Sequence, residues 1–292
     1  MLKISDIHLR DPYILPYNGI YYLYGTRGEN ARGKCSGLDV YMSDNLVDWS
    51  EAYEVFTKPD GFWSDMDYWA PEVHIYKGSF YMFATFKSAE RRRGTQILKA
   101  DSPMGPFLPI SEYPQTPPGW ECLDGTFYVS KKGTPYMVFS HEWKQITDGE
   151  ICALRLSEDL TRAVGEPFVL FCGSSPEWAG NQKYYVTDGP FMYRTKSDRL
   201  IMIWSGFTGG AERKYVESVA YSDNGEIDGE WKHEETLLFE NDGGHGMIFK
   251  SFTNEVCFIM HTPNHSPDER PVIIKLRETD KGLMWEKEIR DE

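Results

Sequence analysis

The stretch Asp11-Pro12-Tyr13-Ile14-Leu15, joined by a short turn to Tyr21-Tyr22-Leu23-Tyr24, forms two apolar strands behind a polar opening residue. The same unit returns four more times along the chain. The later copies open with Ala70-Pro-Glu-Val-His, Asp124-Gly-Thr-Phe-Tyr, Asp188-Gly-Pro-Phe-Met and His245-Gly-Met-Ile-Phe. The openings, at positions 11, 70, 124, 188 and 245, are 59, 54, 64 and 57 residues apart. A period of this length in an aromatic-rich sequence is typical of radial repetition, with one supersecondary unit per copy.

Each copy supplies two further strands after this pair. Third strands are predicted at Asp39-Val-Tyr-Met-Ser-Asp, Gln96-Ile-Leu-Lys-Ala-Asp, Ile151-Cys-Ala-Leu-Arg-Leu, Ser218-Val-Ala-Tyr-Ser-Asp and Val272-Ile-Ile-Lys-Leu. Fourth strands are predicted at the turns Val47-Asp-Trp, Met104-Gly-Pro-Phe, Gly165-Glu-Pro-Phe, Gly229-Glu-Trp and Leu283-Met-Trp. Four antiparallel strands in each of five copies predict an all-β fold, a five-bladed β-propeller, as one domain over residues 1–292. A pair of β-sandwiches would not explain the constant phase of the polar openings.

The composition limits the classes of partner. The 292 residues carry a formal net charge of -14 with a pI near 5.0, which argues against a nucleic-acid partner because phosphates would be repelled. Neutral ligands such as sugars are compatible with this charge. The one dense basic cluster, Arg91-Arg92-Arg93, is expected to be an exposed loop tip.

Other sequence features exclude further classes of protein. The five cysteines are odd in number and never in C-x-x-C spacing, so we expect free thiols and no zinc site. No stretch approaches eighteen apolar residues, so no membrane partner is expected. The N-terminus from Met1 lacks the apolar core of a signal peptide. The expected location is therefore cytoplasmic if Met1 is the native start, and periplasmic or secreted if a signal peptide has been removed.

The propeller geometry predicts a site at one mouth of the central channel. The first strand of each blade is innermost, so the three aspartates and the histidine at the openings would meet there. The antiparallel second strands end at the same mouth, with the segments Thr26-Arg27, Phe86-Lys87, His141-Glu142-Trp143, Ser205-Gly206-Phe207 and His261-Thr262-Pro263-Asn264. Among the aromatic residues expected near this mouth, Trp69, Trp143 and Phe207 are candidates to stack on the apolar face of a sugar.

At these residues the sequence resembles glycoside hydrolase family 43, whose five-bladed propellers cleave arabinofuranosyl and xylosyl linkages with inversion. The resemblance runs from about residue 5 to about residue 280. It is carried by five motifs in order: Arg10-Asp11-Pro12-Tyr13-Ile14 with Tyr22-Leu23-Tyr24-Gly25-Thr26, Trp69-Ala70-Pro71-Glu72-Val73, Asp124, Gly189-Pro190-Phe191 with Met202-Ile203-Trp204-Ser205, and Gly244-His245-Gly246.

The resemblance implies a role for each opening residue. Asp11 corresponds to the general base, Asp124 to the carboxylate that tunes and orients the acid, and Asp188 to the general acid. His245 corresponds to an axial histidine that in some members lies beside a calcium ion, so a calcium site near His245 is an open expectation, although no cofactor is required. Arg270 resembles a fifth-blade arginine that reaches into the site.

One position departs from the family pattern. The acid is normally a glutamate in Glu-Gly-Pro, whereas this chain has Asp188-Gly189-Pro190. Aspartate is one methylene shorter, roughly 1.5 Å less in reach. Glu142, at the end of a second strand, and Glu72, in the second blade, are the alternative acids, and both are otherwise expected to bind substrate or pack between blades.

The predicted chemistry is inverting glycoside hydrolysis. It needs an ionised carboxylate to activate water and a protonated carboxyl roughly 6.5–9.5 Å away to protonate the leaving group. A third carboxylate close to the acid raises the pKa of that acid by like-charge repulsion, and Asp124 is placed for this role. We expect release of pentose, α-L-arabinofuranosyl before β-D-xylosyl, from plant polysaccharides or their oligosaccharides. The alternatives are an endo-arabinanase or exo-galactosidase on the same fold, a phosphorylase, or a sugar-binding propeller in which Asp188 has lost the acid function.

Overall fold

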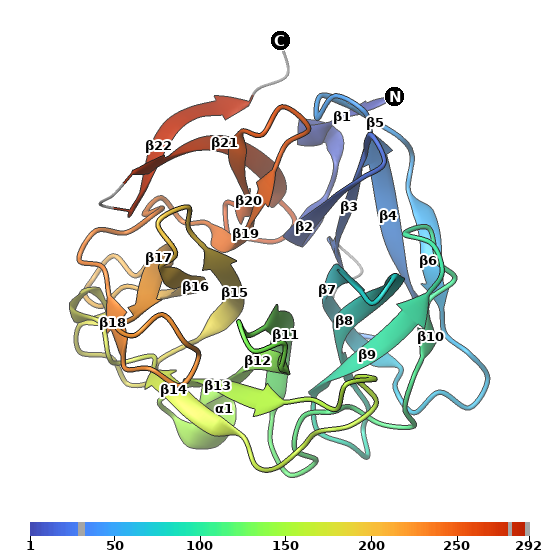
Figure 1. Cartoon of the computed structure of the whole chain (residues 1–292), viewed down its shortest axis with the longest axis horizontal. Coiled ribbons are helices and arrows are strands. Elements are labelled where there is room, and N and C mark those ends of the chain that lie inside the picture. Colours follow the sequence, from blue (N-terminus) through green and yellow to red (C-terminus); the bar gives the residue numbers. More distant parts are fainter. Residues whose placement is uncertain (29–32, 280–281, 290–292) are drawn as a thin grey trace.

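Five antiparallel sheets of four strands surround a central axis in the computed structural model, which describes residues 1–28, 33–279 and 282–289 (Figure 1). Blade one consists of β2 (Leu9–Tyr17), β3 (Ile20–Arg27), β4 (Gly37–Ser43) and β6 (Tyr53–Thr57). Blade two consists of β7 (Met66–Tyr76), β8 (Ser79–Lys87), β9 (Gly94–Ala100) and β10 (Leu108–Pro109). Blade three consists of β11 (Cys122–Val129), β12 (Pro135–His141), β13 (Glu150–Arg155) and β14 (Phe168–Cys172).

The last two blades repeat this order. Blade four consists of β15 (Asp188–Arg194), β16 (Leu200–Phe207), β17 (Tyr215–Ser222) and β18 (Trp231–His233). Blade five consists of β19 (Gly244–Lys250), β20 (Val256–Thr262), β21 (Arg270–Thr279) and β22 (Gly282–Ile289). The remaining elements are short: β1 (Leu2–Lys3), β5 (Asp48–Trp49), α1 (Trp143–Ile146) and the 3₁₀ turns at Ile4–Asp6 and Glu177–Ala179. The predicted five-bladed propeller is confirmed.

One predicted strand has a different partner. The segment at Val47-Asp-Trp was expected to supply the fourth strand of blade one, but Asp48 and Trp49 pair with β1 instead. The fourth strand is β6, which pairs with β4. The prediction failed because the fully buried Trp49 packs in the core beneath the N-terminal segment, where only a two-residue pairing is formed.

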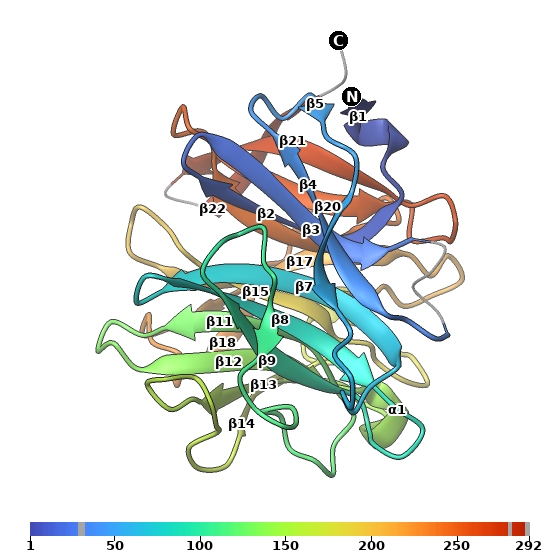
Figure 2. The same cartoon turned by 90° about the vertical axis from the view of Figure 1, so that its right-hand side faces the viewer.

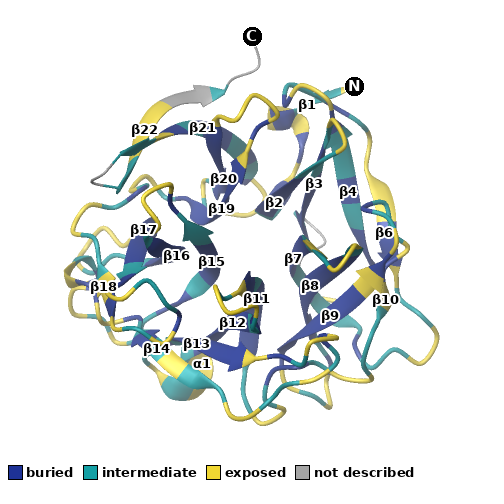
Figure 3. Ribbon diagram, in the orientation of Figure 1, coloured by how far each residue is buried: buried dark blue, intermediate teal, exposed yellow. Residues whose placement is uncertain are grey.

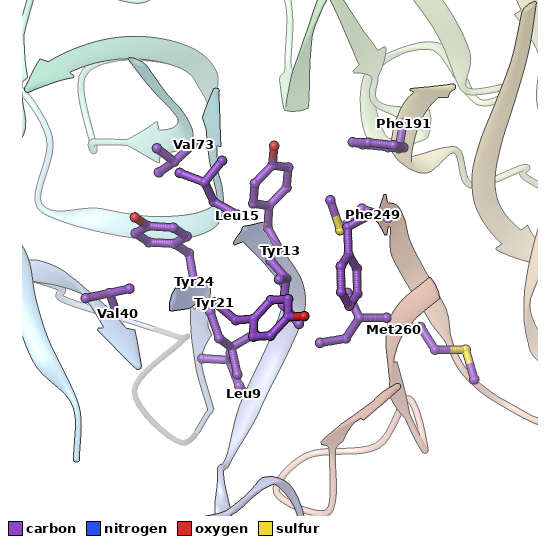
Figure 4. Close-up of a cluster of buried hydrophobic side chains, with 14 of the residues drawn as sticks. Leu9, Tyr13, Leu15, Tyr21, Tyr24, Val40, Val73, Phe191, Phe249 and Met260 are labelled. Carbon is purple, nitrogen blue, oxygen red and sulfur yellow. The ribbon is translucent and has the colours of Figure 1, made fainter. Parts of the chain in front are cut away.

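The inner strands are the most buried, and the outer strands and loops carry the exposed residues (Figure 3). Aromatic side chains fill the spaces between blades. Tyr13 of β2 meets Phe191 of β15 edge-to-face, with ring centroids 6.3 Å apart, and Tyr21 of β3 meets Phe249 of β19 at 6.2 Å (Figure 4). The aromatic-rich composition therefore mostly serves packing between twisted sheets. Cys122, Cys152, Cys172 and Cys257 are free thiols.

Each blade is built from strands that are consecutive in the sequence, so the first and the last blade come from opposite ends of the chain. Contacts between blades one and five close the ring (Figure 2). Arg10 of β2 donates hydrogen bonds to Glu269 Oε1 and to Asn264 Oδ1, at 2.5 and 2.7 Å. The backbone N–H of Asp11 donates to His261 Nδ1 at 3.2 Å. Ring closure and the position of Asp11 thus depend on the same polar contacts.

Every innermost strand contains a β-bulge near its first residues. The pairing register shifts there in all five blades. One residue in each bulge has a positive φ: Asp11 (51°), Ala70 (45°), Asp124 (55°), Gly189 (52°) and His245 (50°). Asp and His tolerate this conformation better than most residues, and bulges are frequent beside active sites, where they redirect a side chain.

The bulges correct the predicted phase of blade four. The position equivalent to Asp11, Asp124 and His245 is Gly189, so Asp188 lies one residue ahead of the common phase. A side chain at Gly189 has no room, because an added Cβ would lie 2.6 Å from Cδ2 of His245. The bulge position is therefore the predicted opening residue in blades one, two, three and five, and the residue after it in blade four.

Candidate active site

A cavity of about 380 Å³ opens where the five bulges converge. Of the ten residues predicted for the site, it is lined by Asp11, Trp69, Asp124, Glu142, Trp143, Asp188, Phe207 and His245. The structure thus brings eight of the ten predicted residues together at one cavity, from blades one to five.

Asp11 is held as an ionised carboxylate. Its Oδ1 lies 3.1 Å from His245 Nδ1, and its Oδ2 accepts a hydrogen bond from Thr26 Oγ1 at 2.6 Å. Burial alone would raise the pKa of Asp11, but the positive charge and hydrogen bond of His245, with the charge of Arg10, lower that pKa well below its ordinary value. A carboxylate that stays ionised can accept a proton from water, as a general base must.

The two histidines beside Asp11 have opposite charge states. Burial lowers the pKa of His245, but the carboxylates of Asp11, Asp124 and Asp188 outweigh it and raise that pKa to about 10. Burial dominates at His261 and lowers its pKa to about 4. His261 is therefore neutral, with Nδ1 accepting from the backbone of Asp11 and Nε2 facing Asn264 Oδ1 at 3.2 Å.

Asp124 and Asp188 form the protonated part of the site. Burial raises the pKa of Asp124, and the negative charges of Asp188 and Asp11 add to it against the opposing charge of His245. Burial also raises the pKa of Asp188, helped by the charges of Glu142 and Asp11. Asp124 Oδ2 accepts from the backbone N–H of Gly189 at 3.1 Å, and Asp188 Oδ2 accepts from the Tyr215 hydroxyl at 3.2 Å. Repulsion and burial together make this pair retain a proton that Asp11 does not.

Glu142 is engaged by two cations. Its Oε2 accepts from Arg93 Nη1 at 2.5 Å, and Lys144 Nζ lies 3.1 Å from its Oε1. Arg93 also donates to Asp67 and lies over the ring of Trp69, 4.4 Å from the centroid. The expectation that Arg91-Arg92-Arg93 is an exposed loop tip is wrong for Arg93, which is buried because it neutralises these two carboxylates. Both carboxylate oxygens of Glu142 therefore contact cationic side chains.

Two predicted site residues lie elsewhere. Glu72 is buried two residues beyond the bulge of β7, where its Oε2 lies 2.9 Å from His74 Nε2. Arg270 binds the N-terminal segment: it donates to the carbonyl of Ser5 at 3.0 Å and contacts His8 Nε2 at 2.6 Å. Arg270 therefore does not line the cavity, whereas Arg10 of blade one does.

The residues that sequence reasoning missed are Arg10, Tyr184, Arg213, Tyr215 and Asn264, all of which line the cavity. Arg10 directly precedes the predicted base, Asp11, and Asn264 belongs to a segment that was expected at the mouth of the channel. Both could have been assigned to the site on these grounds. Tyr215 begins β17, three residues before the predicted third strand. Tyr184 and Arg213 lie in loops and carried no periodic signal.

The surroundings of His245 do not suit a calcium ion held by protein ligands. The ring is a cation with its Nδ1 directed at Asp11 and Asp124, whereas calcium takes about six to eight oxygen ligands. Across residues 1–28, 33–279 and 282–289, no group of three or more His, Cys, Asp or Glu side chains is placed to hold a metal ion. We assign no catalytic step to a metal. Over the same residues, no helix has the length and apolarity needed to cross a bilayer.

The sequence profile of the glycosyl hydrolases family 43 matches residues 4–281. The chain belongs to this family. An endo-arabinase from Bacteroides thetaiotaomicron has a similar structure, with a TM-score of 0.87 and 38% identity over 96% of this chain and 98% of that chain.

Two curated relatives match at lower identity. The xylosidase/arabinosidase 43A of Humicola insolens is 26% identical over 48% of this chain, and the extracellular endo-α-(1→5)-L-arabinanase 1 of Bacillus subtilis (strain 168) is 22% identical over 49% of it. In each case the match spans 46% of the relative. As a family 43 member the chain is a glycoside hydrolase, and its cavity holds the ionised and the protonated carboxyls that such chemistry requires.

Proposed function

We propose that this family 43 glycosidase hydrolyses α-L-arabinofuranosyl linkages of plant polysaccharides or their oligosaccharides with inversion. The observation that carries the proposal is the opposite displacement of two carboxyl pKa values in one cavity: lowered at Asp11 and raised at Asp188. Pairs of carboxyls whose surroundings separate their pKa values are typical of acid and base partners.

In the proposed mechanism Asp11 is the general base and Asp188 the general acid. A water molecule attacks the anomeric carbon while Asp11 takes one of its protons. The bond between that carbon and the glycosidic oxygen breaks, and the leaving oxygen takes the proton of Asp188. The turnover leaves Asp11 protonated and Asp188 ionised, and exchange with solvent restores both.

The neighbouring residues support these two states. His245 and Arg10 keep Asp11 ionised, as their charges lower its pKa. Asp124, whose Oδ2 accepts from the backbone N–H of Gly189, also has a raised pKa, so Asp124 and Asp188 together retain the proton. The negative charge of Glu142, whose carboxylate also contacts Arg93 and Lys144, helps to raise the pKa of Asp188.

The choice of arabinose rests on similarity. The structural relative with 38% identity is named an endo-arabinase, and one of the curated relatives is named an arabinanase. The second candidate is a β-D-xylosyl linkage, favoured by the Humicola relative whose name covers both sugars.

The test is initial-rate hydrolysis of aryl α-L-arabinofuranoside, β-D-xyloside and β-D-galactoside beside arabino- and xylo-oligosaccharides. The Asp11→Asn protein is the blank, since asparagine tolerates the positive φ at this position. We expect release of arabinose or arabino-oligosaccharides that disappears in the variant. Hydrolysis of xylosides alone would make β-D-xylose the sugar released, in place of arabinose. If no substrate of the panel is hydrolysed but sugars still bind, a non-catalytic sugar-binding propeller would be favoured.

A further inference from the structure

The second strand of each blade carries a polar side chain opposite the residue that precedes the bulge. These residues are Thr26, Thr85, Ser140, Ser205 and His261. Four of them accept a hydrogen bond from the backbone N–H of the bulge residue in the next blade. Thr26 Oγ1 accepts from Ala70 at 2.8 Å, Thr85 Oγ1 from Asp124 at 2.9 Å, Ser205 Oγ from His245 at 2.7 Å, and His261 Nδ1 from Asp11 at 3.2 Å. We call these four contacts the bulge latches, because each fixes the backbone of a bulge in the neighbouring blade.

Blade three has a different arrangement at this position. The hydroxyl of Ser140 is buried and has no hydrogen-bond partner among the residues that the structure describes. The backbone N–H of Gly189, the bulge residue of blade four, donates to Asp124 Oδ2 at 3.1 Å instead. Ser140 and Ser205 therefore occupy equivalent positions in neighbouring blades, but only Ser205 forms a latch.

The latch at Ser205 is extended by a buried carboxyl group. Glu217 of β17 pairs with Ser205 of β16, and both side chains are fully buried. Glu217 Oε2 accepts from Ser205 Oγ at 2.7 Å and from the backbone N–H of Gly246 at 3.2 Å. Ser205 and Glu217 together thus hold two consecutive backbone N–H groups, those of His245 and Gly246.

The neighbouring backbone leaves just enough room for this pair. A Cβ at Gly244 would lie 2.4 Å from Ser205 Oγ and 3.1 Å from Glu217 Oε2. Burial raises the pKa of Glu217 to about 8, against the hydrogen bond of Ser205 and the charge of His245. The carboxyl is therefore mostly uncharged near neutral pH, and its accepting oxygen is what the latch uses.

We propose that Glu217 is a positioning residue, which acts through Ser205 and the two backbone N–H groups to fix the bulge that directs the His245 ring at Asp11. The proposal rests on the function proposed above, because the base assignment needs Asp11 to be ionised. His245 Nδ1 lies 3.1 Å from Asp11 Oδ1 and 3.7 Å from Asp124 Oδ2. An opposite charge favours an ionised carboxylate strongly only within about 4–6 Å, so a displaced ring would no longer hold Asp11 in this state.

Loss of the latch has a defined electrostatic consequence. The titratable groups that interact with the His245 ring come from five other strands: Asp11 of β2, Asp124 of β11, Asp188 of β15, Glu217 of β17 and His261 of β20. The three aspartates raise the pKa of His245. If the ring moves away from them, the pKa of His245 falls and the pKa of Asp11 rises. Activity requires ionised Asp11, so the acidic limb of the kcat/KM profile then moves to higher pH.

The test compares four variants of the full chain. Glu217→Ala removes the accepting carboxyl, whereas Glu217→Gln keeps an oxygen that can accept from Ser205 and Gly246. Ser205→Ala removes the latch hydroxyl, and Ser140→Ala is its matched control, because the Ser140 hydroxyl forms no latch. If Glu217→Ala does not fold, the two serine variants decide the question.

Two properties are measured besides stability in urea. The first is the pKa of His245, from NMR titration of protein with ¹⁵N-labelled histidine, in which the signal is assigned by its loss in His245→Asn. The second is the pH dependence of kcat/KM on the substrate that the wild type hydrolyses best. The NMR titration reports the position of the ring whether or not the protein hydrolyses any sugar.

We expect the pKa of His245 to fall by about one unit or more in Glu217→Ala and Ser205→Ala, with the acidic limb moved to higher pH. Glu217→Gln and Ser140→Ala should keep the wild-type values. A loss of stability in Glu217→Ala and Ser205→Ala without a change in the pKa of His245 would overturn the proposal. An equal change in Glu217→Gln and Glu217→Ala would also overturn it, because charge and not position would then be the cause.

The two proposals can fail separately. If the wild type hydrolyses no glycoside but the pKa of His245 falls as expected, the catalytic function is wrong and the positioning role of Glu217 stands. If the wild type is active and the pKa of His245 is the same in all four variants, only the positioning role fails.

Discussion

Replacing Tyr215 with phenylalanine tests which carboxyl donates the proton. The Tyr215 hydroxyl donates to Asp188 Oδ2 at 3.2 Å and stabilises the ionised form of that carboxyl. Removing the hydroxyl therefore raises the pKa of Asp188. Because the acid must be protonated, activity falls as the pH rises through this pKa, so the alkaline limb of the kcat/KM profile moves to higher pH in Tyr215→Phe.

The size of this shift follows from the geometry. A hydrogen bond to a charged group contributes about 1.5–3 kcal/mol, and one of 3.2 Å is long for a hydroxyl donor, so about 1 kcal/mol is expected. At 1.36 kcal/mol per pKa unit this is a shift of about 0.7 pH unit. The acidic limb, which reports Asp11, should stay in place.

The assay is the pH dependence of kcat/KM on an unactivated oligosaccharide, over the range in which the protein stays folded. Tyr13→Phe is the matched control, since the hydroxyl of Tyr13 lies 3.4 Å from His74 Nδ1 and outside the cavity. An alkaline limb that does not move in Tyr215→Phe, or that moves equally in Tyr13→Phe, would refute the assignment of the proton to Asp188.

Three further perturbations have expected outcomes. Glu142→Gln removes a negative charge that raises the pKa of Asp188, so the alkaline limb should move to lower pH by about 0.5–1 unit; loss of oligosaccharide cleavage with normal rates on activated aryl glycosides would instead make Glu142 the acid. Gly189→Ala should cost about 2–4 kcal/mol in urea unfolding and abolish most activity, because the new Cβ meets the ring of His245 at 2.6 Å; Gly133→Ala, at a similar positive φ but with open space around it, should cost only about 1 kcal/mol, and equal losses would contradict the steric account. Dialysis against EDTA should leave kcat/KM unchanged, since the imidazolium of His245 disfavours a bound cation; a loss restored by calcium would show that the axial site needs one.

The fold could be predicted from the sequence because the same unit of antiparallel strands is repeated five times along the chain. Each copy carries apolar strands and turn residues at the same spacing, and this pattern is recognisable even though the loops differ between copies. The positions of Asp11, Asp124 and His245 followed from the same repetition. The sequence also showed that Asp188 departs from the family glutamate.

Details that depend on three-dimensional contacts could not be read this way. Asp188-Gly189 resembles Asp124-Gly125 in sequence, but the backbone conformation shows that Gly189, and not Asp188, occupies the shared bulge position. Arg270 was placed in the site by its position in blade five, whereas its side chain is taken by the N-terminal segment. A side chain's direction is decided by partners that are distant in the sequence.

The loops that line the cavity show the same limit. Tyr184 and Arg213 belong to no repeat, and their contact depends on two separate loops meeting at one edge. Loop conformation is set by such tertiary contacts more than by local pattern. The polar residues at the openings of the innermost strands were therefore predictable, and the loop residues that line the cavity were not.

The central claim is that Asp11 activates water for direct, inverting attack while Asp188 protonates the leaving group. It is tested most directly by ¹H NMR of the first product formed from an α-L-arabinofuranoside, with the Asp11→Asn protein as the blank. The account predicts that β-L-arabinofuranose appears first, before it equilibrates, and that Asp11→Asn forms none. Initial appearance of the α-anomer, or unchanged turnover in Asp11→Asn, would contradict it.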